Sequence, residues 1–430
     1  MALDLVFVNQ TGLPDDQVFI TFQRQSTTSG FDVSYGGTAV SFSSSDAIMS
    51  NSVDLGTIGA GGMTVGTLVG GIVFVSYGAA LTATTTPPSF IGTGGADFDT
   101  AFQPFELTMQ GNSGDQGDMT AINYFTAPMT ITSFSGGVRG TQLQQAAFAQ
   151  TAAQLGPALG ELTNDSSASV IENAQGQVVR YIGPSSYGPA DDNPFPSMLP
   201  YLQEIHADGQ TTTISNNNAF NAGTTNYDFT LALVATVDAD GSIVMDGSIT
   251  TVVTPSGGTA SSGPTFTAAT VKISAKDRKA LDFVIYGQAI DTDVVSFGSG
   301  WDDLATYMQQ EGIDPGALGI TQSLAIGEIT SGLLMGFVGS SVIPPGGSTP
   351  LADMPSREWW ALDPMIAFSK VQSDPKCYNQ YAGVLFTGSN NEVYSIPFSD
   401  RMGTGPLVNS VSYQGQSVDT WVVTLLPPVS

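Results

Sequence analysis

The sequence predicts a mainly β fold with an inserted α+β part, and three observations carry this prediction. Before about residue 136, short β-branched and aromatic runs alternate with Gly, Ser, Asn and Pro turns, a pattern typical of strands and their connections. Between residues 136 and 375, helical and strand-like runs are mixed. Strand-like runs return afterwards, so we expect residues 1–135 and 376–430 to form one β-rich core and residues 136–375 to form an inserted subdomain.

The strands expected in the first part are residues 3–9, 17–23, 71–78, 104–110 and 127–134. Within the fourth of these, Phe105, Leu107 and Met109 share one face, so Glu106 points away from the apolar side. Residues 55–96 carry no charge, but glycines interrupt this segment every few residues. Its apolar runs fit buried strands better than a membrane-spanning helix, and we expect no membrane insertion.

The expected elements of the inserted part are helices and one hairpin. We expect a helix over residues 141–155, with Thr141 as N-cap and Gly156 as the stop, and a hairpin over residues 226–253 that turns at Asp240 and Gly241. Further helices are expected over residues 198–207, 301–312, 317–329 and 358–371. The strands expected at the end of the chain are residues 383–387, 392–398 and 419–426.

Composition narrows the chemistry. The 430 residues contain 11 Lys and Arg against 38 Asp and Glu, a net charge of −27 that repels a phosphate backbone, so nucleic acid is not an expected partner. A single cysteine excludes an intramolecular disulfide, and a single histidine leaves little for a His-based metal site or a Ser-His-Asp triad. We therefore expect no metal and no other cofactor, and carboxylate chemistry remains.

The first ten residues, MALDLVFVNQ, lack the basic start and the long apolar run of a secretory signal peptide. Three interpretations follow: a cytoplasmic protein, export by another route, or a trimmed precursor. The compartment is therefore not determined by the sequence.

Several stretches occur in an order that resembles a known family. They are LDLVFVNQTGLPDDQVFITF, GGIVFVSYGAAL, FELTM, DMTAINYFTAPM, RYIGPSSYGPADDNPFPSMLPYLQEI and QYAGVLFTGSNNEVYSIPFSDRMG. This succession resembles the β-1,3-glucanases of glycoside hydrolase family 64, relatives of the thaumatin-like proteins. The resemblance implies a thaumatin-like β-sandwich or barrel core and a mixed α/β subdomain that flank a wide acidic groove for β-1,3-glucan. It also implies that the last stretch forms a closing hairpin.

The resemblance implies a catalytic pair as well. Members of the family use a Glu and an Asp on neighbouring strands as general acid and general base, with inversion at the anomeric carbon. The Glu corresponds to Glu106, and the following strand has its first acid at Asp118 but Asn123 where a second acid is expected. An amide cannot take a proton from water near neutral pH, so Asp118 or Asp115 would have to serve as the base.

Substrate-binding roles are implied for Asn123, Tyr124, Asp115, Asp400 and Tyr394. Ordinary structural roles stand beside these. Glu106 could be a solvated strand residue, Asp115 and Asp118 could bond their own turn, and Asp400 could cap a turn. The sequence does not fix which face of the second strand Glu106 meets, because a one-residue slip reverses the answer.

Two functions follow. The first is a glucan-active protein with Glu106 as acid and Asp118 or another carboxylate as base. The second is a non-catalytic relative, either a glycan-binding protein or a structural protein that self-assembles through sheet edges. Asn123, the absence of a visible signal peptide and a surface poor in charge favour the second.

Overall fold

The computed structural model of the chain describes residues 2–92, 94–163, 165–368, 371, 377–398, 401–402 and 406–429. The expected fold class, mainly β with a mixed α/β part, is confirmed. The chain divides into two compact units, described separately below. The first unit comprises Met1–Ser186, Val384–Ser395 and Thr404–Ser430, and the second comprises Tyr187–Gly383 and Ile396–Gly403. The sequence-based limits of the core and the inserted subdomain, near residues 136 and 376, stay a prediction.

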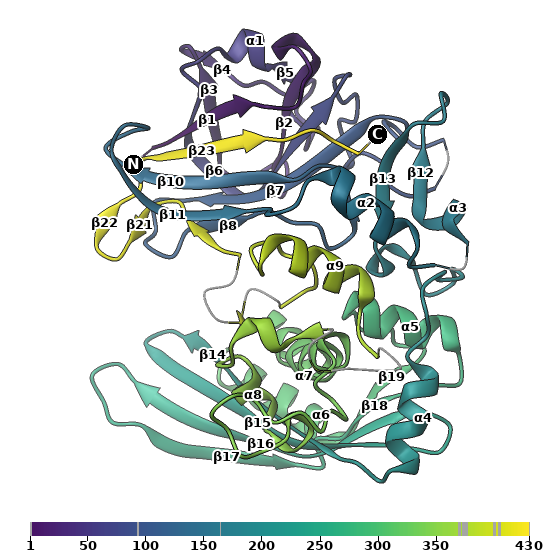
Figure 1. Cartoon of the computed structure of the whole chain (residues 1–430). Helices are drawn as coiled ribbons and strands as arrows, with labels where there is room; N and C mark the ends of the chain where they lie inside the picture. Colours follow the sequence, from purple (N-terminus) through teal and green to yellow (C-terminus); the bar gives the residue numbers. More distant parts are fainter. Residues whose placement is uncertain are drawn as a thin grey trace. The chain divides into compact units, whose positions relative to one another are not determined.

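The first unit is built on one large sheet, with 12 strands among the described residues (Figure 1). Its main path runs through β11 (Thr141–Ala147), β10 (Met129–Ser135), β23 (Thr420–Leu425), β1 (Leu3–Asn9), β6 (Met63–Tyr77), β7 (Ala101–Met109), β8 (Gln116–Asp118) and β20 (Val408–Asn409). Four strands branch from this path: β2 (Val18–Gln23), β3 (Phe31–Tyr35), β4 (Thr38–Ala39) and β5 (Val53–Asp54).

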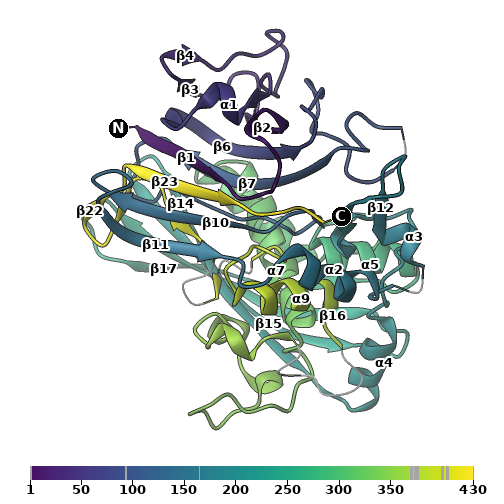
Figure 2. The ribbon, with the colours of Figure 1, turned by 45° about the horizontal axis from the view of Figure 1, so that its top comes forward.

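The two ends of this path approach each other. Figure 2 shows β11, β10, β23 and β1 side by side, so the last strand of the chain lies between β10 and the first strand. At the other end of the path, Asn409 N in β20 donates to Gln144 Oε1 in β11 at 2.9 Å. The Nε1 of buried Trp421 donates to Asn409 O at 2.9 Å. The sheet is therefore nearly closed, like a barrel.

Smaller elements complete the first unit. A second sheet joins β12 (Val170–Glu172), β13 (Val178–Ile182) and β9 (Tyr124–Phe125), and a short hairpin joins β21 (Ser412–Tyr413) and β22 (Gln416–Ser417). The helices are α1 (Leu55–Ile58), α2 (Ala152–Gly160) and α3 (Ser166–Ser169), with 3-10 turns η1 (Asp15–Gln17) and η2 (Pro184–Ser186). Helix α9 (Gln380–Ser389) follows later in the chain; its residues from Val384 belong to the first unit and those up to Gly383 to the second.

The second unit packs helices on a separate antiparallel sheet. Its strands are β14 (Thr212–Ala222), β15 (Thr225–Val237), β16 (Ile243–Pro255), β18 (Val271–Ile273) and β19 (Val295–Phe297), with β17 (Ser261–Thr267) also paired to β16. Its helices are α4 (Leu199–Ala207), α5 (Arg278–Gly287), α6 (Ser299–Gln310), α7 (Gly316–Met335) and α8 (Ser356–Trp359), with 3-10 turns η3 (Leu351–Asp353) and η4 (Pro364–Ile366).

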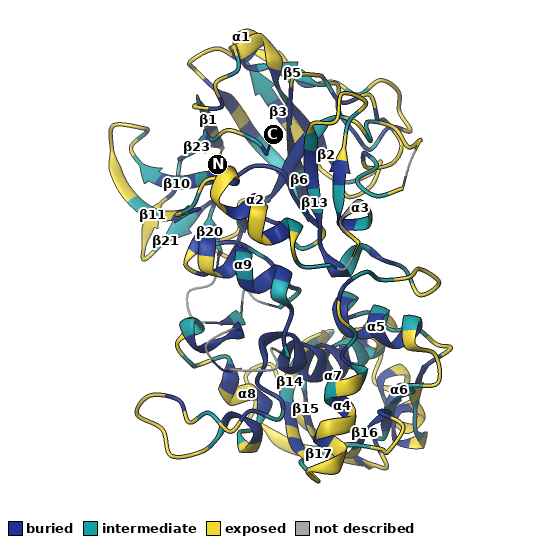
Figure 3. Cartoon of the chain, turned by 45° about the vertical axis from the view of Figure 1, so that its right-hand side comes forward, coloured by how far each residue is buried: buried dark blue, intermediate teal, exposed yellow. Residues whose placement is uncertain are grey.

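Helix α7 is the centre of the second unit. Its residues from Leu324 to Met335 are all buried, and Figure 3 shows much of this helix in the colour of buried residues. A helix that is apolar on every side must be enclosed by other elements. Helix α7 packs against β14, β15, α5, α6 and α8.

The hairpin of residues 226–253 is confirmed as β15 and β16, and the helices expected over residues 198–207, 301–312 and 317–329 are confirmed as α4, α6 and α7. The helix expected over residues 141–155 is wrong. Residues Thr141–Ala147 form β11, and the helix begins only after Thr151, whose side chain makes a capping box with Gln154. Pairing with β10 along its length overrides the helical composition of TQLQQAA. Gly156 does not end the helix but lies inside it.

Three further expectations near the end of the chain are also corrected. Residues 358–371 do not form one helix, because Asp363 and Pro364 interrupt it and start η4 instead; residues 369 and 370 lie outside the described ranges. Residues 383–387 belong to α9 rather than to a strand, so the described part of the closing stretch does not form the expected hairpin. Tyr381, Ala382, Leu385 and Phe386 are buried at helical spacing, and a short apolar run does not distinguish the two structures. In residues 392–398 the structure has a single bridge at Tyr394 in place of a strand.

None of the helices in the described part of the chain combines the length and the hydropathy that a bilayer-spanning segment needs. The uncharged segment of residues 55–96 contains α1 and the long strand β6. The wide groove expected from the sequence stays a prediction.

Candidate functional site

The strand register of the first unit places the predicted catalytic pair directly opposite each other. Glu106 in β7 pairs with Asp118 in β8, and on its other side Glu106 pairs with Ile72 in β6. Ile72 in turn pairs with Gln23 in β2. Because residues opposite each other on neighbouring strands point to the same face, these side chains form one row across four strands.

Gly117 allows β8 to approach β7 at this point. A Cβ atom on Gly117 would lie 2.0 Å from the carbonyl oxygen of Glu106, a backbone atom that cannot move aside. Only glycine therefore fits next to Asp118 in this register. The close approach brings Asp118 opposite Glu106.

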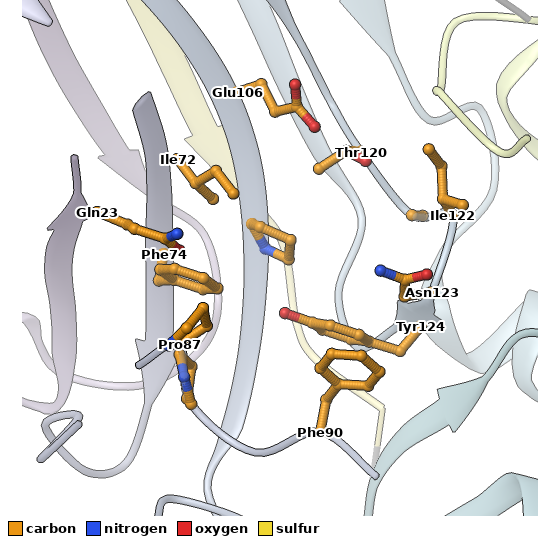
Figure 4. Close-up of a pocket in the computed structure, with 13 residues that line it drawn as sticks. Gln23, Ile72, Phe74, Pro87, Phe90, Glu106, Thr120, Ile122, Asn123 and Tyr124 are labelled. Atoms are coloured by element: carbon orange, nitrogen blue, oxygen red, sulfur yellow. The ribbon is translucent and has the colours of Figure 1, made fainter. Parts of the chain in front are cut away.

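A pocket of about 220 Å³ lies on the face of this row (Figure 4). Phe74 and Pro104, which also pair across β6 and β7, extend its floor. Its complete lining is Gln23, Ile72, Phe74, Pro87, Pro88, Phe90, Pro104, Glu106, Thr120, Ala121, Ile122, Asn123 and Tyr124. Sites for drug-sized ligands usually measure about 300–1,000 Å³, so this pocket fits one part of a longer ligand.

The segment that follows β8 forms one wall and is held by side chains from other elements. Buried Gln103 in β7 donates to Thr120 O at 2.8 Å, and its Oε1 accepts from Thr126 N at 2.8 Å. Further along the chain, Ser185 Oγ donates to Ile122 O at 2.7 Å. The amide of Gly183 donates to Asn123 O at 2.7 Å. The wall is thus fixed to both the large and the small sheet of this unit.

Aromatic rings form the far end of the pocket. Phe90 and Tyr124 are stacked with ring centroids 5.0 Å apart, and Phe102 meets Tyr124 edge-on at 5.4 Å. In Figure 4, Glu106 lies at one end of the pocket and these two stacked rings lie at the other. Burial raises the pKa of the Tyr124 hydroxyl, with nearby Arg180 acting in the opposite direction, so this hydroxyl stays protonated and can donate a hydrogen bond.

Three of the residues singled out from the sequence line this pocket: Glu106, Asn123 and Tyr124. Glu106 is half-buried, whereas Asn123 is exposed and its Oδ1 accepts from Ser185 Oγ at 3.1 Å. Asp118 has only 5% of its surface exposed and is not part of the lining, although it continues the row behind Glu106. Glu106 is therefore the carboxylate that faces the pocket.

The remaining residues singled out from the sequence lie elsewhere. Asp115 is buried in the β7–β8 turn, where its Oδ2 accepts from the amides of Gln110 and Asn112. Tyr394 bonds through its backbone to Met119 and Ala121, which places it beside the wall but not in the lining. Asp400 lies outside the described residues. Asp115 thus has a clear structural role in this turn.

The sequence reasoning missed the loop that carries Pro87, Pro88 and Phe90. The available signal for a ligand-binding loop was the presence of two prolines and an aromatic residue in an uncharged segment. Proline stiffens a loop, and an aromatic ring can stack on a ligand. Nothing local connects this loop to Glu106, because the sheet brings them together. In the described part of the chain, no group of three His, Cys, Asp or Glu residues has the arrangement of a metal site.

The pocket can act on a ligand in two ways. Its proline and aromatic side chains offer an apolar surface, and Glu106, Thr120 and Asn123 offer hydrogen-bonding groups at one side. The carboxyl group of Glu106, when protonated, can also donate its proton to a ligand oxygen. Asp118 places a second carboxyl group opposite Glu106.

No protein-family model matches the chain, and no curated protein matches it in sequence. Solved structures do match it. A laminaripentaose-producing β-1,3-glucanase in complex with laminaritetraose aligns with a TM-score of 0.58 and 14% identity, over 99% of each chain. A β-1,3-glucanase domain of glycoside hydrolase family 64 from Clostridium beijerinckii aligns with a TM-score of 0.52 and 10% identity, over 99% of this chain and 98% of the other. The chain thus has a fold like that of family 64 glucanases.

Proposed function

We propose that this protein binds β-1,3-glucan at the pocket beside Glu106 and hydrolyses it with inversion at the anomeric carbon. The observation that carries the proposal is the register that sets Glu106 opposite Asp118, at the edge of a pocket with an aromatic end. The fold shared with a β-1,3-glucanase that was solved with laminaritetraose supports the choice of ligand.

In this proposal Glu106 is the general acid and Asp118 is the general base. The Cβ atoms of opposite residues are about 4.5–5.5 Å apart, and the two carboxyl carbons lie one and two bonds further out. The pair can therefore span the separation of about 6.5–9.5 Å that leaves room for a water molecule in an inverting enzyme. Glu106 protonates the oxygen of the leaving sugar while Asp118 takes a proton from the water that attacks the anomeric carbon.

A second candidate function is glucan binding without hydrolysis. It is favoured by the burial of Asp118 outside the pocket lining and by exposed Asn123 in the lining itself. An amide can orient a water molecule but cannot accept its proton, so a site served by Asn123 alone would bind and not cleave. Self-assembly, the structural role considered from the sequence, stays a prediction.

Hydrolysis of laminarin by the full-length protein tests the proposal. We expect wild type to release oligosaccharides whose new reducing ends start in the α configuration, as seen by NMR during the first minutes. We expect Glu106→Gln and Asp118→Asn each to lower kcat by about 10² to 10⁴.

The control is Glu172→Gln, which makes the same change at an exposed position of β12 in the same unit and should keep wild-type activity. Calorimetric titration with laminaritetraose separates the two candidates. Binding by wild type without any release of sugar would favour the non-catalytic function, and an absence of binding would contradict both.

A further inference from the structure

Arg180 in β13 is a fully buried cation beneath the aromatic end of the pocket. None of its surface is exposed, and its guanidinium carbon lies 4.5 Å from the centre of the Phe102 ring. Burial lowers the pKa of Arg180 to about 10, with Tyr124 and Asp99 acting in the opposite direction. The side chain therefore keeps its charge at neutral pH.

The guanidinium binds the backbone of the loop that precedes β7. Its Nη1 donates to Phe98 O at 2.8 Å and to Phe90 O at 3.3 Å, and its Nη2 donates to Thr100 O. These carbonyls come from both ends of the segment between Phe90 and Thr100. One planar group with several fixed donors thus holds the two ends of the loop together.

The same contacts connect Arg180 to the pocket. Phe102 contacts both the guanidinium and the Tyr124 ring, and Tyr124 stacks on Phe90. Phe90 is held at its carbonyl by Arg180 and at its ring by Tyr124. The position of Phe90, and with it the space between the aromatic end and Glu106, therefore depends on Arg180.

We propose that Arg180 is a positioning residue for substrate binding: it holds Phe90 and Tyr124 at the spacing that lets one sugar ring fit between them and Glu106. This inference rests on the proposed function, because it concerns how the same pocket selects a sugar ring that has an apolar face. The CH groups of a pyranose ring pack on the aromatic end, and the ring hydroxyls reach the polar side of the pocket.

The test compares Arg180→Lys and Arg180→Met in the full-length protein. Methionine keeps much of the length but removes the donors, whereas lysine keeps a charge on one rotatable donor group. We expect the affinity for laminaritetraose to fall by about tenfold for Arg180→Met and by less for Arg180→Lys. We expect kcat with saturating laminarin to change by less than about threefold, because Glu106 and Asp118 lie on β7 and β8 and not on this loop.

Arg24→Met is the matched control. Arg24 also donates to backbone carbonyls, those of Ser45 and Ala47, and its guanidinium lies 4.1 Å from the centre of the Phe42 ring. It holds a different loop of the same unit and does not line the pocket. Equal losses of affinity in Arg24→Met and Arg180→Met would overturn the inference.

Two further measurements keep the inference testable. The first is a double-mutant cycle. If Arg180 acts through Phe90, the binding free energy lost in the double variant, Arg180→Lys with Phe90→Ala, is smaller than the sum of the losses in the two single variants. Fully additive losses would contradict this.

The second is hydrogen exchange, which needs no ligand. The amides of Ser89, Phe98 and Thr100, which donate to carbonyls within the loop, should exchange faster in Arg180→Lys than in wild type. Unchanged exchange would overturn the inference. If wild type binds no laminaritetraose, the proposed function fails and this exchange still decides whether Arg180 holds the loop.

Discussion

Arg180 in the first unit and Arg401 in the second each lie against an aromatic ring, but the two guanidiniums have different acceptors. Arg180 of the first unit lies 4.5 Å from the centre of Phe102 and donates to loop carbonyls. Arg401 of the second unit lies 4.4 Å from the centre of Trp360 and donates to the carboxylate of Glu328. A carbonyl-bound cation orders the loop that it touches, whereas an ion pair ties together the elements from which its two charges come.

Glu328 is the centre of the second arrangement. It lies in the middle of α7 with none of its surface exposed, and it accepts from Asn216 Nδ2 at 2.6 Å and from Trp360 Nε1 at 3.1 Å as well as from Arg401. These donors come from β14, from the end of α8 and from the segment after α9. We therefore expect changes at Glu328 to lower stability and, under the proposed function, changes at Arg180 to lower ligand affinity.

The largest effect that we expect comes from breaking this buried centre with Glu328→Leu. The change leaves the Arg401 charge without its carboxylate and two half-buried donors, Asn216 and Trp360, without this acceptor. Removing one partner of a buried ion pair typically costs about 3–5 kcal/mol. Urea unfolding measures the loss. The control is Glu358→Leu at an exposed position of α8 in the same unit, expected to stay within about 0.5 kcal/mol of wild type.

If Glu328→Leu still folds at low temperature, its ligand binding can also be measured. We expect its affinity for laminaritetraose to match that of wild type, because Glu328 belongs to the second unit and does not line the pocket. A loss of affinity comparable to that of Arg180→Met would remove the distinction between the two buried centres.

A smaller effect is expected from Gly327→Ala, next to Glu328 in α7. A Cβ atom at this position would lie 2.3 Å from the ring of Phe398, so the ring must move away from the helix. Overpacking of this kind typically costs about 1–3 kcal/mol. Gly319→Ala in the same helix is the matched control, since that Cβ would meet nothing within 4 Å. Because alanine favours helix over glycine, we expect Gly319→Ala to raise stability by about 0.5–1 kcal/mol. Equal effects of the two changes on the melting temperature would contradict this account.

What the sequence could predict was local. The alternation of Phe105, Leu107 and Met109 with Glu106 is a period-two pattern, and the structure buries the first three and leaves Glu106 half-buried. Residues 141–147 were assigned to a helix from composition, but their pairing with β10 decides their structure.

The site depends on contacts that a local pattern does not contain. A one-residue slip between β7 and β8 would turn Asp118 away from Glu106, and the close approach at Gly117 is part of what fixes the register. Arg180 and Phe90 are 90 residues apart in sequence, so neither one indicates the other. The sequence pattern thus indicated Asp118, which pairs with Glu106, whereas the aromatic end of the pocket is formed only in the folded chain.

The smallest effect is expected from Asp282 in α5, another buried ionisable residue, whose cationic neighbour is half exposed. It is 1% exposed, accepts from Ser197 Oγ at 2.7 Å and lies 3.5 Å from Arg278, whose side chain is 48% exposed. Burial raises the pKa of Asp282 above its ordinary value of 3.8, and the bonds to Ser197 and Arg278 offset this only in part. Folding therefore favours the protonated form of Asp282. The contribution of this protonated form to stability is fully present below the unfolded pKa and is lost as pH rises through the folded pKa.

We expect Asp282→Asn to become more stable relative to wild type as pH rises from about 4, and this difference in unfolding free energy then to level off. Ser197→Ala removes a bond that stabilises the ionised form, so it should be more destabilising near neutral pH than at pH 3. Urea unfolding across this pH range measures both variants. A difference that stays constant with pH, or that favours Asp282→Asn most in acid, would contradict the raised pKa of Asp282.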